Sequence, residues 1–157
     1  MTMDMDLLVD LPAALIVPFA DALNNDFYAD PDLIKESFAH GRAANLIHLA
    51  TGWKFDLFPA HNDPYSRVQL ARRVKREIRP AADDAIECAV STAEDMILRK
   101  LEWYRLGGET SERQWGDVLG ICLSSGAALD VAHLRAWAPE LRVEDLLERL
   151  LSEAGVK

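Results

Sequence analysis

The sequence has little cysteine, and its histidines are scattered. Only two cysteines are present, Cys88 and Cys122, and they form no spacing motif. We therefore expect two buried thiols in a reducing cytoplasm rather than a disulfide. The four histidines show no metal-ligand spacing, which argues against a zinc site.

Positive charge and long apolar runs are also scarce. Lysine and arginine number 17 against 26 aspartates and glutamates, which gives a formal net charge of −9. This balance argues against a broad electrostatic footprint for nucleic acid or anionic membrane, although it leaves a local basic site open. No apolar run approaches the length of a membrane span, and the acidic N-terminus lacks the basic region of a signal peptide. We expect a cytoplasmic protein with no membrane partner.

The 157 residues are enough for one domain with a sizeable core. Alternating apolar residues and turn signals predict strands at 4–11, 27–28, 45–50, 53–58 and 86–90. Apolar residues at helical spacing predict helices at 12–23, 31–40, 64–75, 93–106, 111–123, 130–137 and 143–154. This order predicts an α+β fold. We expect a small mixed β-sheet with flanking helices over 1–90, and a C-terminal helical bundle over 91–157 that packs on it as a single domain.

Three aspartates lie on the predicted strands. Asp4 and Asp6 project from the same side of the first strand, about 7 Å apart along the backbone. Asp56 lies on a later strand that otherwise resembles core sequence, which is unusual for an acid. Together the three carboxylates predict a binding site for Mg²⁺, because the two metal ions of phosphoryl-transfer sites share carboxylate ligands. The alternatives are a solvated acidic pair, and an Asp56 that pairs with Lys54 or a nearby arginine.

A basic run extends from Arg67 to Arg79, over and beyond the predicted helix at 64–75. Such a run is typical of a solvated helix face, and contact with a phosphate or an RNA backbone is the alternative. No interleaved aromatic residues follow it in the manner of a platform for single-stranded nucleic acid.

Several motifs resemble a known family. Asp4-Met-Asp6-Leu-Leu-Val, followed by Trp53-Lys54-Phe-Asp56-Leu-Phe58, resembles the polymerase-β-type nucleotidyltransferases. The stretch from Thr92 to Ile121, with Leu-Glu-Trp-Tyr-Arg-Leu-Gly-Gly-Glu inside it, is similar to bacterial nucleotidyltransferase-like proteins, as is its continuation over 129–138. These proteins are distantly similar to the nucleotidyltransferase toxins of abortive-infection toxin–antitoxin pairs. The resemblance covers nearly the whole chain.

The resemblance implies an activity and a set of site residues. The activity is Mg²⁺-dependent transfer of a nucleoside monophosphate from a nucleoside triphosphate to an RNA or protein acceptor, with an antitoxin or a second copy of the chain as candidate partners. Asp4, Asp6 and Asp56 match the metal ligands, and Lys100 and Asp117 match catalytic residues on later helices. From the residues alone, Lys100 is typical of a solvated lysine, and Asp117 of a surface charge or a helix–helix salt bridge.

The sequence departs from the family at one point. A Gly-Ser or Gly-Gly segment precedes the acidic strand in these proteins and holds the triphosphate through backbone N–H groups, and it is lacking here. This departure predicts weak Mg²⁺ binding and little triphosphate affinity. The alternative function is therefore that of a catalytically inactive, N-terminally shortened member that acts as an interaction or structural protein. A true start upstream of Met1 is a further alternative.

Overall fold

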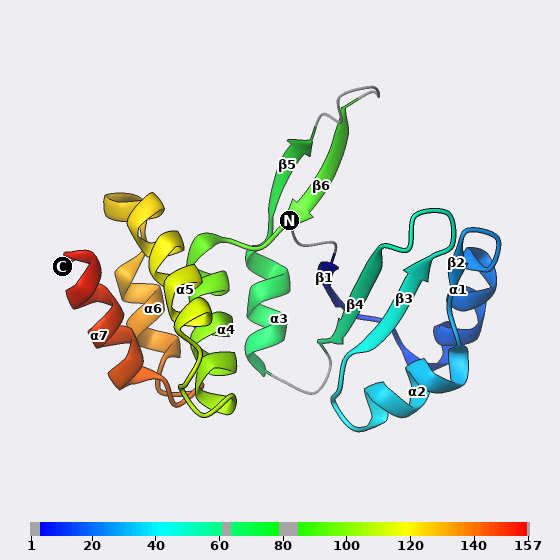
Figure 1. Cartoon of the computed structure of the whole chain (residues 1–157), viewed down its shortest axis with the longest axis horizontal. Coiled ribbons are helices and arrows are strands. Elements are labelled where there is room, and N and C mark those ends of the chain that lie inside the picture. The colour runs from blue at the N-terminus through cyan, green and yellow to red at the C-terminus, as the bar shows by residue number, and fades with distance from the viewer. Residues whose placement is uncertain (1–3, 61–63, 79–84, 157) are drawn as a thin grey trace. The chain divides into compact units, whose positions relative to one another are not determined.

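The computed structural model describes residues 4–60, 64–78 and 85–156, with the backbone alone at Asp4 and Ile78. The chain is α+β, as the sequence predicts. Its residues divide into two compact units, Met1–Ala71 and Arg72–Lys157 (Figure 1).

The first unit contains a four-stranded mixed sheet. Its elements are β1 (Asp4–Val9), a 3₁₀ turn (Ala13–Leu15), α1 (Ile16–Leu23), β2 (Phe27–Tyr28), α2 (Pro31–Ala39), β3 (Ala44–His48), β4 (Lys54–Pro59) and α3 (Pro64–Arg72), whose last residue begins the second unit. The strand order is β1-β4-β3-β2, with β1 parallel to β4 and the other neighbours antiparallel.

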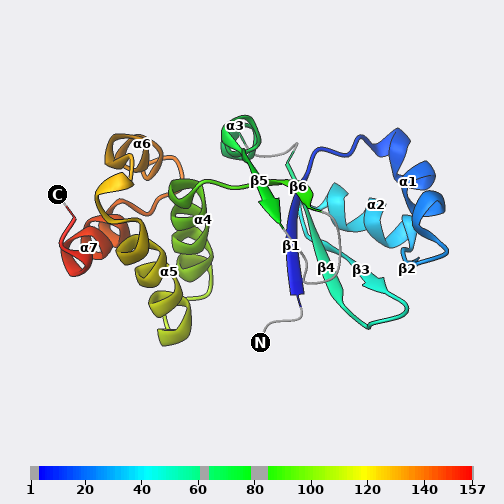
Figure 2. The same ribbon diagram turned by 90° about the horizontal axis from the view of Figure 1, so that it is seen from above.

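One face of this sheet is covered by α1 and α2, as both views of the ribbon show (Figures 1 and 2). Ile16 of α1 and Phe38 of α2 form a buried cluster with Leu46 of β3 and Leu57 of β4. Side chains alternate along a strand, so the residues next to Leu57 in β4 project from the opposite face. The sheet therefore has one apolar face under helices and a second face on which Asp56 lies.

Local chemistry explains where the helices of the first unit begin. The Oδ1 atom of Asp30 accepts hydrogen bonds from the backbone N–H groups of Asp32 (2.9 Å) and Leu33 (3.2 Å), and Pro31 follows as the first helical residue. The helix predicted at 12–23 is shortened, because a 3₁₀ turn precedes it and α1 begins only at Ile16. Pro18 consequently lies in the first turn of α1, where its missing N–H costs no helical hydrogen bond.

The prediction of a helix from 64 to 75 is wrong at its C-terminal end. The helix α3 ends at Arg72, and Val74–Ile78 forms β5, which pairs antiparallel with β6 (Ile86–Val90). Charged residues over this stretch conceal the alternation of apolar and polar residues that is typical of a strand. The strand is defined by backbone hydrogen bonds to β6, which lies beyond the next loop, so the basic run is divided between a helix and a strand.

The second unit continues from this ribbon into a helical bundle, as predicted. Its helices are α4 (Ala93–Leu106), α5 (Glu112–Ser125), α6 (Val131–Trp137) and α7 (Glu144–Ala154), with a 3₁₀ turn at Gly126–Ala128. Leu98, Leu101, Val118, Leu147 and Leu150 are at most 1% exposed and form part of its core. No helix in the described part of the chain is long and apolar enough to cross a bilayer.

Candidate functional site

The structure brings two of the predicted metal ligands together on neighbouring strands. Asp6 of β1 and Asp56 of β4 are register partners in the parallel pair. Adjacent strands lie about 4.8 Å apart, and side chains at paired positions project from the same face. This is the face opposite α1 and α2. Asp4 lies two residues earlier in β1, opposite Lys54 in the register, and its side chain lies outside the described part.

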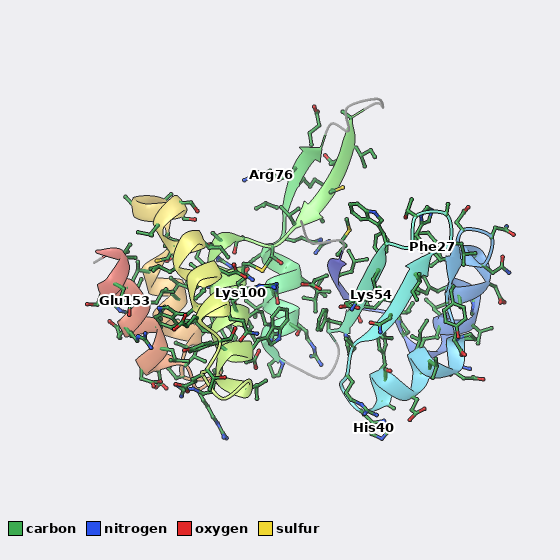
Figure 3. The ribbon with its side chains drawn as sticks, in the orientation of Figure 1. Phe27, His40, Lys54, Arg76, Lys100 and Glu153 are labelled. Atoms are coloured by element: carbon green, nitrogen blue, oxygen red, sulfur yellow. The ribbon has the colours of Figure 1, made fainter. Side chains whose placement is uncertain are left out.

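Asp56 lies in an unusual environment. Its side chain is only 19% exposed, and its Oδ2 atom lies 3.1 Å from the Nζ atom of Lys54, which is labelled in Figure 3. Its Oδ1 atom is buried and has no hydrogen-bond partner among the residues that the structure describes. A buried carboxylate oxygen without a donor or cation is costly, and such atoms in native proteins require an explanation. The expected pairing with Lys54 therefore accounts for only one of the two carboxylate oxygens.

The surroundings of Asp56 suit a hard cation. Asp6 is exposed on one side of it, and Asn45 of β3 is its register partner on the other side. Carboxylate and amide oxygens are the ligands that Mg²⁺ accepts, and Mg²⁺ commonly takes only one or two protein carboxylates beside water and phosphate. Among the described side chains, no three histidine, cysteine, aspartate or glutamate residues are grouped for a metal ion. The fit therefore depends on Asp6 and Asp56, with Asp4 as the third predicted ligand.

The two other predicted site residues lie together in the second unit. The Nζ atom of Lys100 in α4 lies 3.8 Å from the Oδ2 atom of Asp117 in α5, and their side chains are 28% and 50% exposed. This is the helix–helix salt bridge that was one of the two alternatives for Asp117. An exposed pair at this distance contributes little to stability. The catalytic roles that the resemblance implies for Lys100 and Asp117 stay a prediction.

The second unit also contains a buried polar cluster that sequence reasoning missed. Asp95 of α4 is fully buried. Its Oδ2 atom accepts hydrogen bonds from the Thr92 hydroxyl (2.8 Å) and from Nε of Arg72 (3.3 Å), and its Oδ1 atom lies 2.9 Å from Nε2 of His133. Because an ionised carboxylate only accepts, Nε2 carries the hydrogen in this contact. The cluster thus joins Arg72, the first residue of the second unit, to α4 and α6.

Glu94 extends this cluster to the start of α6. Its Oε1 atom accepts a hydrogen bond from the backbone N–H of Asp130 (3.0 Å), and its Oε2 atom lies 3.6 Å from an Arg72 nitrogen. Burial alone would raise the pKa of Glu94, but hydrogen bonds from the backbone of Asp130 and of Glu94 itself, with the charge of Arg72, lower it below 4.5.

Only one part of this cluster has a local signal in the sequence. Thr92 and Asp95 have the spacing of a helix cap, and the Thr92 oxygen does accept the Asp95 N–H (3.2 Å). Arg72 and His133 are 23 and 38 residues from Asp95, so no spacing motif reveals them. The cluster fixes His133 in one orientation at a position where its side chain is only 9% exposed.

The two cysteines are both free thiols, as expected, but the expected burial holds for Cys122 and is wrong for Cys88. Cys122 is buried among the bundle helices, and this burial raises the pKa of its thiol. Cys88 in β6 is partly exposed. A raised pKa keeps Cys122 protonated and chemically inert, so it is a packing residue rather than a nucleophile.

Comparison of the chain with protein-family models, with curated proteins and with solved structures found no match. The geometry of the sheet face around Asp56 is therefore the structural basis for a functional proposal.

Proposed function

We propose that the sheet face around Asp6 and Asp56 binds Mg²⁺ in a nucleotidyltransferase-like protein. The activity would be transfer of a nucleoside monophosphate from a nucleoside triphosphate to an RNA or protein acceptor. The observation that carries the proposal is the buried Oδ1 atom of Asp56, which has no hydrogen-bond partner in the described part of the chain, on a residue that is the register partner of Asp6. A cation at this position would satisfy that oxygen and offset the charge of both carboxylates.

The residues around Asp56 have distinct tasks in this proposal. Asp6, Asp56 and Asp4 would hold the ion, and their strands fix the spacing of the carboxylates. Lys54 balances the charge of Asp56 before an ion enters and would be close to an anionic triphosphate afterwards. When bound, Mg²⁺ neutralises charge on phosphate oxygens during phosphoryl transfer.

Lys100 and Asp117 keep the catalytic roles that the resemblance implies for them. Lys100 would neutralise charge that develops on the phosphate, and Asp117 would orient its ammonium group. The 3.8 Å contact between them supports this division of tasks, since it already places an acceptor beside the lysine.

A second candidate function is that of a non-catalytic interaction or structural protein. The observation in its favour is the ion pair of Lys54 and Asp56 at 3.1 Å, which gives Asp56 a structural role without a metal. In this case the acid stabilises the sheet through its lysine, and neither a metal nor a triphosphate is needed.

Binding of Mn²⁺, followed by electron paramagnetic resonance, tests the metal site directly because bound Mn²⁺ loses its free-ion signal. We expect Asp6→Asn and Asp56→Asn each to weaken Mn²⁺ binding about tenfold or more, since each removes one charged ligand. Asp32→Asn is the matched control, because its side chain is 89% exposed and lies on α2. Equal Mn²⁺ affinity in all four proteins would overturn the metal site.

Nucleotide transfer separates the two candidate functions. The enzyme is expected to transfer label from α-³²P-labelled nucleoside triphosphate to transfer RNA or to protein, with dependence on Mg²⁺ and on Asp56. The non-catalytic candidate predicts no transfer, and it also predicts that Lys54→Met destabilises the protein as much as Asp56→Asn does.

A further inference from the structure

The hairpin of β5 and β6 forms a two-stranded ribbon in the second unit, and no other described strand pairs with it. In Figure 1 it extends away from helices α4–α7. Two-stranded ribbons are marginally stable alone in water, and an open strand edge is a template for pairing with another chain. The open edges of the ribbon are therefore candidate sites for pairing with another chain.

The ribbon has two different faces. Val74 lies opposite Val90 and Arg76 opposite Cys88, and with Ile86 these positions share one face. Lys75 and Glu77 alternate onto the other face, where Lys75 contacts Glu87 (2.7 Å). Ile86 is 52% exposed. The first face is thus mainly apolar and incompletely covered.

The sequence of β5, Val-Lys-Arg-Glu-Ile, is self-complementary about its centre. If two copies of the strand run antiparallel with Arg76 opposite Arg76, Lys75 of each copy lies opposite Glu77 of the other. Val74 of each copy then lies opposite Ile78 of the other. Opposite charges and β-branched residues at directly opposed positions are the pairs that stabilise antiparallel strands.

We propose that the outer edge of β5 is a homodimer interface, at which two copies of the chain pair antiparallel about a two-fold axis at Arg76. The two ribbons then form one four-stranded sheet in the order β6-β5-β5-β6. The interface is isologous, so each favourable Lys75–Glu77 contact occurs twice. A second copy is the partner that this strand sequence fits. In the antiparallel pair, the charged residues of one copy face opposite charges of the other, and the apolar end residues face apolar residues.

Arg76 is the one unfavourable element of this interface. It is exposed, lies at the centre of β5 and is labelled in Figure 3. On the axis it opposes the same residue of the second copy, and like charges directly opposite each other are destabilising. Together with the small area of five opposed residue pairs, this repulsion gives a dimer with a dissociation constant in the micromolar range.

Charge reversal with analytical ultracentrifugation tests the pairing in the full chain. Glu77→Lys turns two attractive contacts into two repulsive ones, and we expect it to raise the dissociation constant about tenfold or more. Within its own ribbon Glu77 lies opposite Glu87, so the new lysine faces a carboxylate across the two strands. Circular dichroism of the variant separates loss of the dimer from damage to the ribbon.

Two further variants serve as matched controls. The exchange Lys75→Glu with Glu77→Lys restores both intermolecular contacts, keeps one lysine beside Glu87, and is expected to recover the parent dissociation constant. Glu140→Lys makes the same charge change at an exposed position outside the ribbon and is expected to leave the dimer unchanged. Arg76→Thr removes the axial repulsion and is expected to tighten the dimer.

Oxidative cross-linking tests the register. Arg76→Cys in a Cys88→Ser background places the two new thiols opposite each other on the axis, with Cα atoms about 5 Å apart, within disulfide range. Lys75→Cys in the same background places them about 8 Å apart, beyond that range. The Cys88 replacement prevents a disulfide within one ribbon, because Cys88 lies opposite Arg76.

We expect diamide to cross-link the Arg76→Cys chain into a covalent dimer and to leave the Lys75→Cys chain monomeric on a denaturing gel. A chain that sediments as a monomer throughout the micromolar range would overturn the proposal, as would a dimer that Glu77→Lys does not weaken. A Cys88–Cys88 cross-link in the parent chain would also overturn it, because it would indicate pairing through β6.

Discussion

The Nε2 atom of His133 lies 2.9 Å from the Oδ1 atom of Asp95, and this contact joins α6 to α4 in the second unit. Asp95 is fully buried and also accepts hydrogen bonds from Arg72 and Thr92. A buried carboxylate with three donors is fully satisfied, and each donor depends on it. The contacts of Asp95 therefore hold the first turns of α4 and α6 to each other and to Arg72.

Asp95→Asn should strongly destabilise the protein. The amide keeps the shape of the side chain but removes the charge that Arg72 and His133 face, so the partly buried Arg72 guanidinium loses its nearer carboxylate and keeps only Glu94, at 3.6 Å. Breaking a buried pair in this way costs about 3–5 kcal/mol. Urea unfolding followed by circular dichroism measures the loss. Asp117→Asn, at a half-exposed position, is the control and should cost less than about 1 kcal/mol. Equal losses in the two variants would show that Asp95 has no special role.

Glu94 should make stability depend on acid pH. Burial raises its pKa in the folded protein, but the backbone hydrogen bonds from Asp130 and Glu94, with smaller effects of Thr92 and Arg72, together lower the pKa below 4.5. A lowered pKa means that the unfolded chain binds the proton more readily, so the stabilisation is present above about pH 4.5. It is lost as the pH falls through the folded pKa. Urea midpoints measured between neutral and acid pH should therefore fall less steeply in Glu94→Gln than in the parent.

The control for this pH dependence is Glu140→Gln, because Glu140 is exposed and this is the same change of side chain outside the cluster. Its urea midpoints should follow those of the parent at every pH. A Glu94→Gln profile parallel to the parent profile would contradict the assignment of acid sensitivity to Glu94.

The elements that were predicted correctly have local signals. Asp30, Thr92 and Ser111 cap their helices through side-chain oxygens, and the beginnings of α2, α4 and α5 follow from those residues alone. The strand β5 has no such signal, because its charged residues also fit a helix and its identity depends on pairing with β6. Sequence patterns thus sufficed where a residue and its partner lie within one turn of helix.

In the candidate site, too, the features with a local sequence signal were predicted, and those that depend on contacts between strands and helices were not. Alternation along the strand predicted that Asp56 shares a face with Lys54, and the two are in contact. The register of β1 against β4, which places Asp6 beside Asp56, depends on how the apolar residues of both strands meet α1 and α2. The buried Oδ1 atom of Asp56 depends on all of these contacts, so no sequence pattern could reveal it.

Trp115 should be the most sensitive position in α5. Its ring is 8% exposed, lies 5.4 Å from the Tyr104 ring, and has the Arg149 guanidinium 4.0 Å from its centre. Trp115→Ala removes all of these contacts and should cost about 3–5 kcal/mol. Trp115→Phe keeps the aromatic contacts and loses the indole hydrogen bond to Glu153, so it should cost clearly less. Thermal unfolding by calorimetry distinguishes the two, and equal losses would mean that ring packing is unimportant.

Lys100 and Asp117 allow stability and catalysis to be separated. As an exposed salt bridge at 3.8 Å, the pair should contribute less than about 1 kcal/mol, and Lys100→Ala should hardly change urea unfolding. If Lys100 neutralises phosphate charge, the same variant should lower nucleotide transfer about a hundredfold, the size of effect found when a charge-stabilising donor is removed. The exchange Lys100→Asp with Asp117→Lys restores the ion pair but moves the ammonium group to α5. It should therefore recover stability without recovering transfer, and recovery of both would show that the pair acts only through its charge balance.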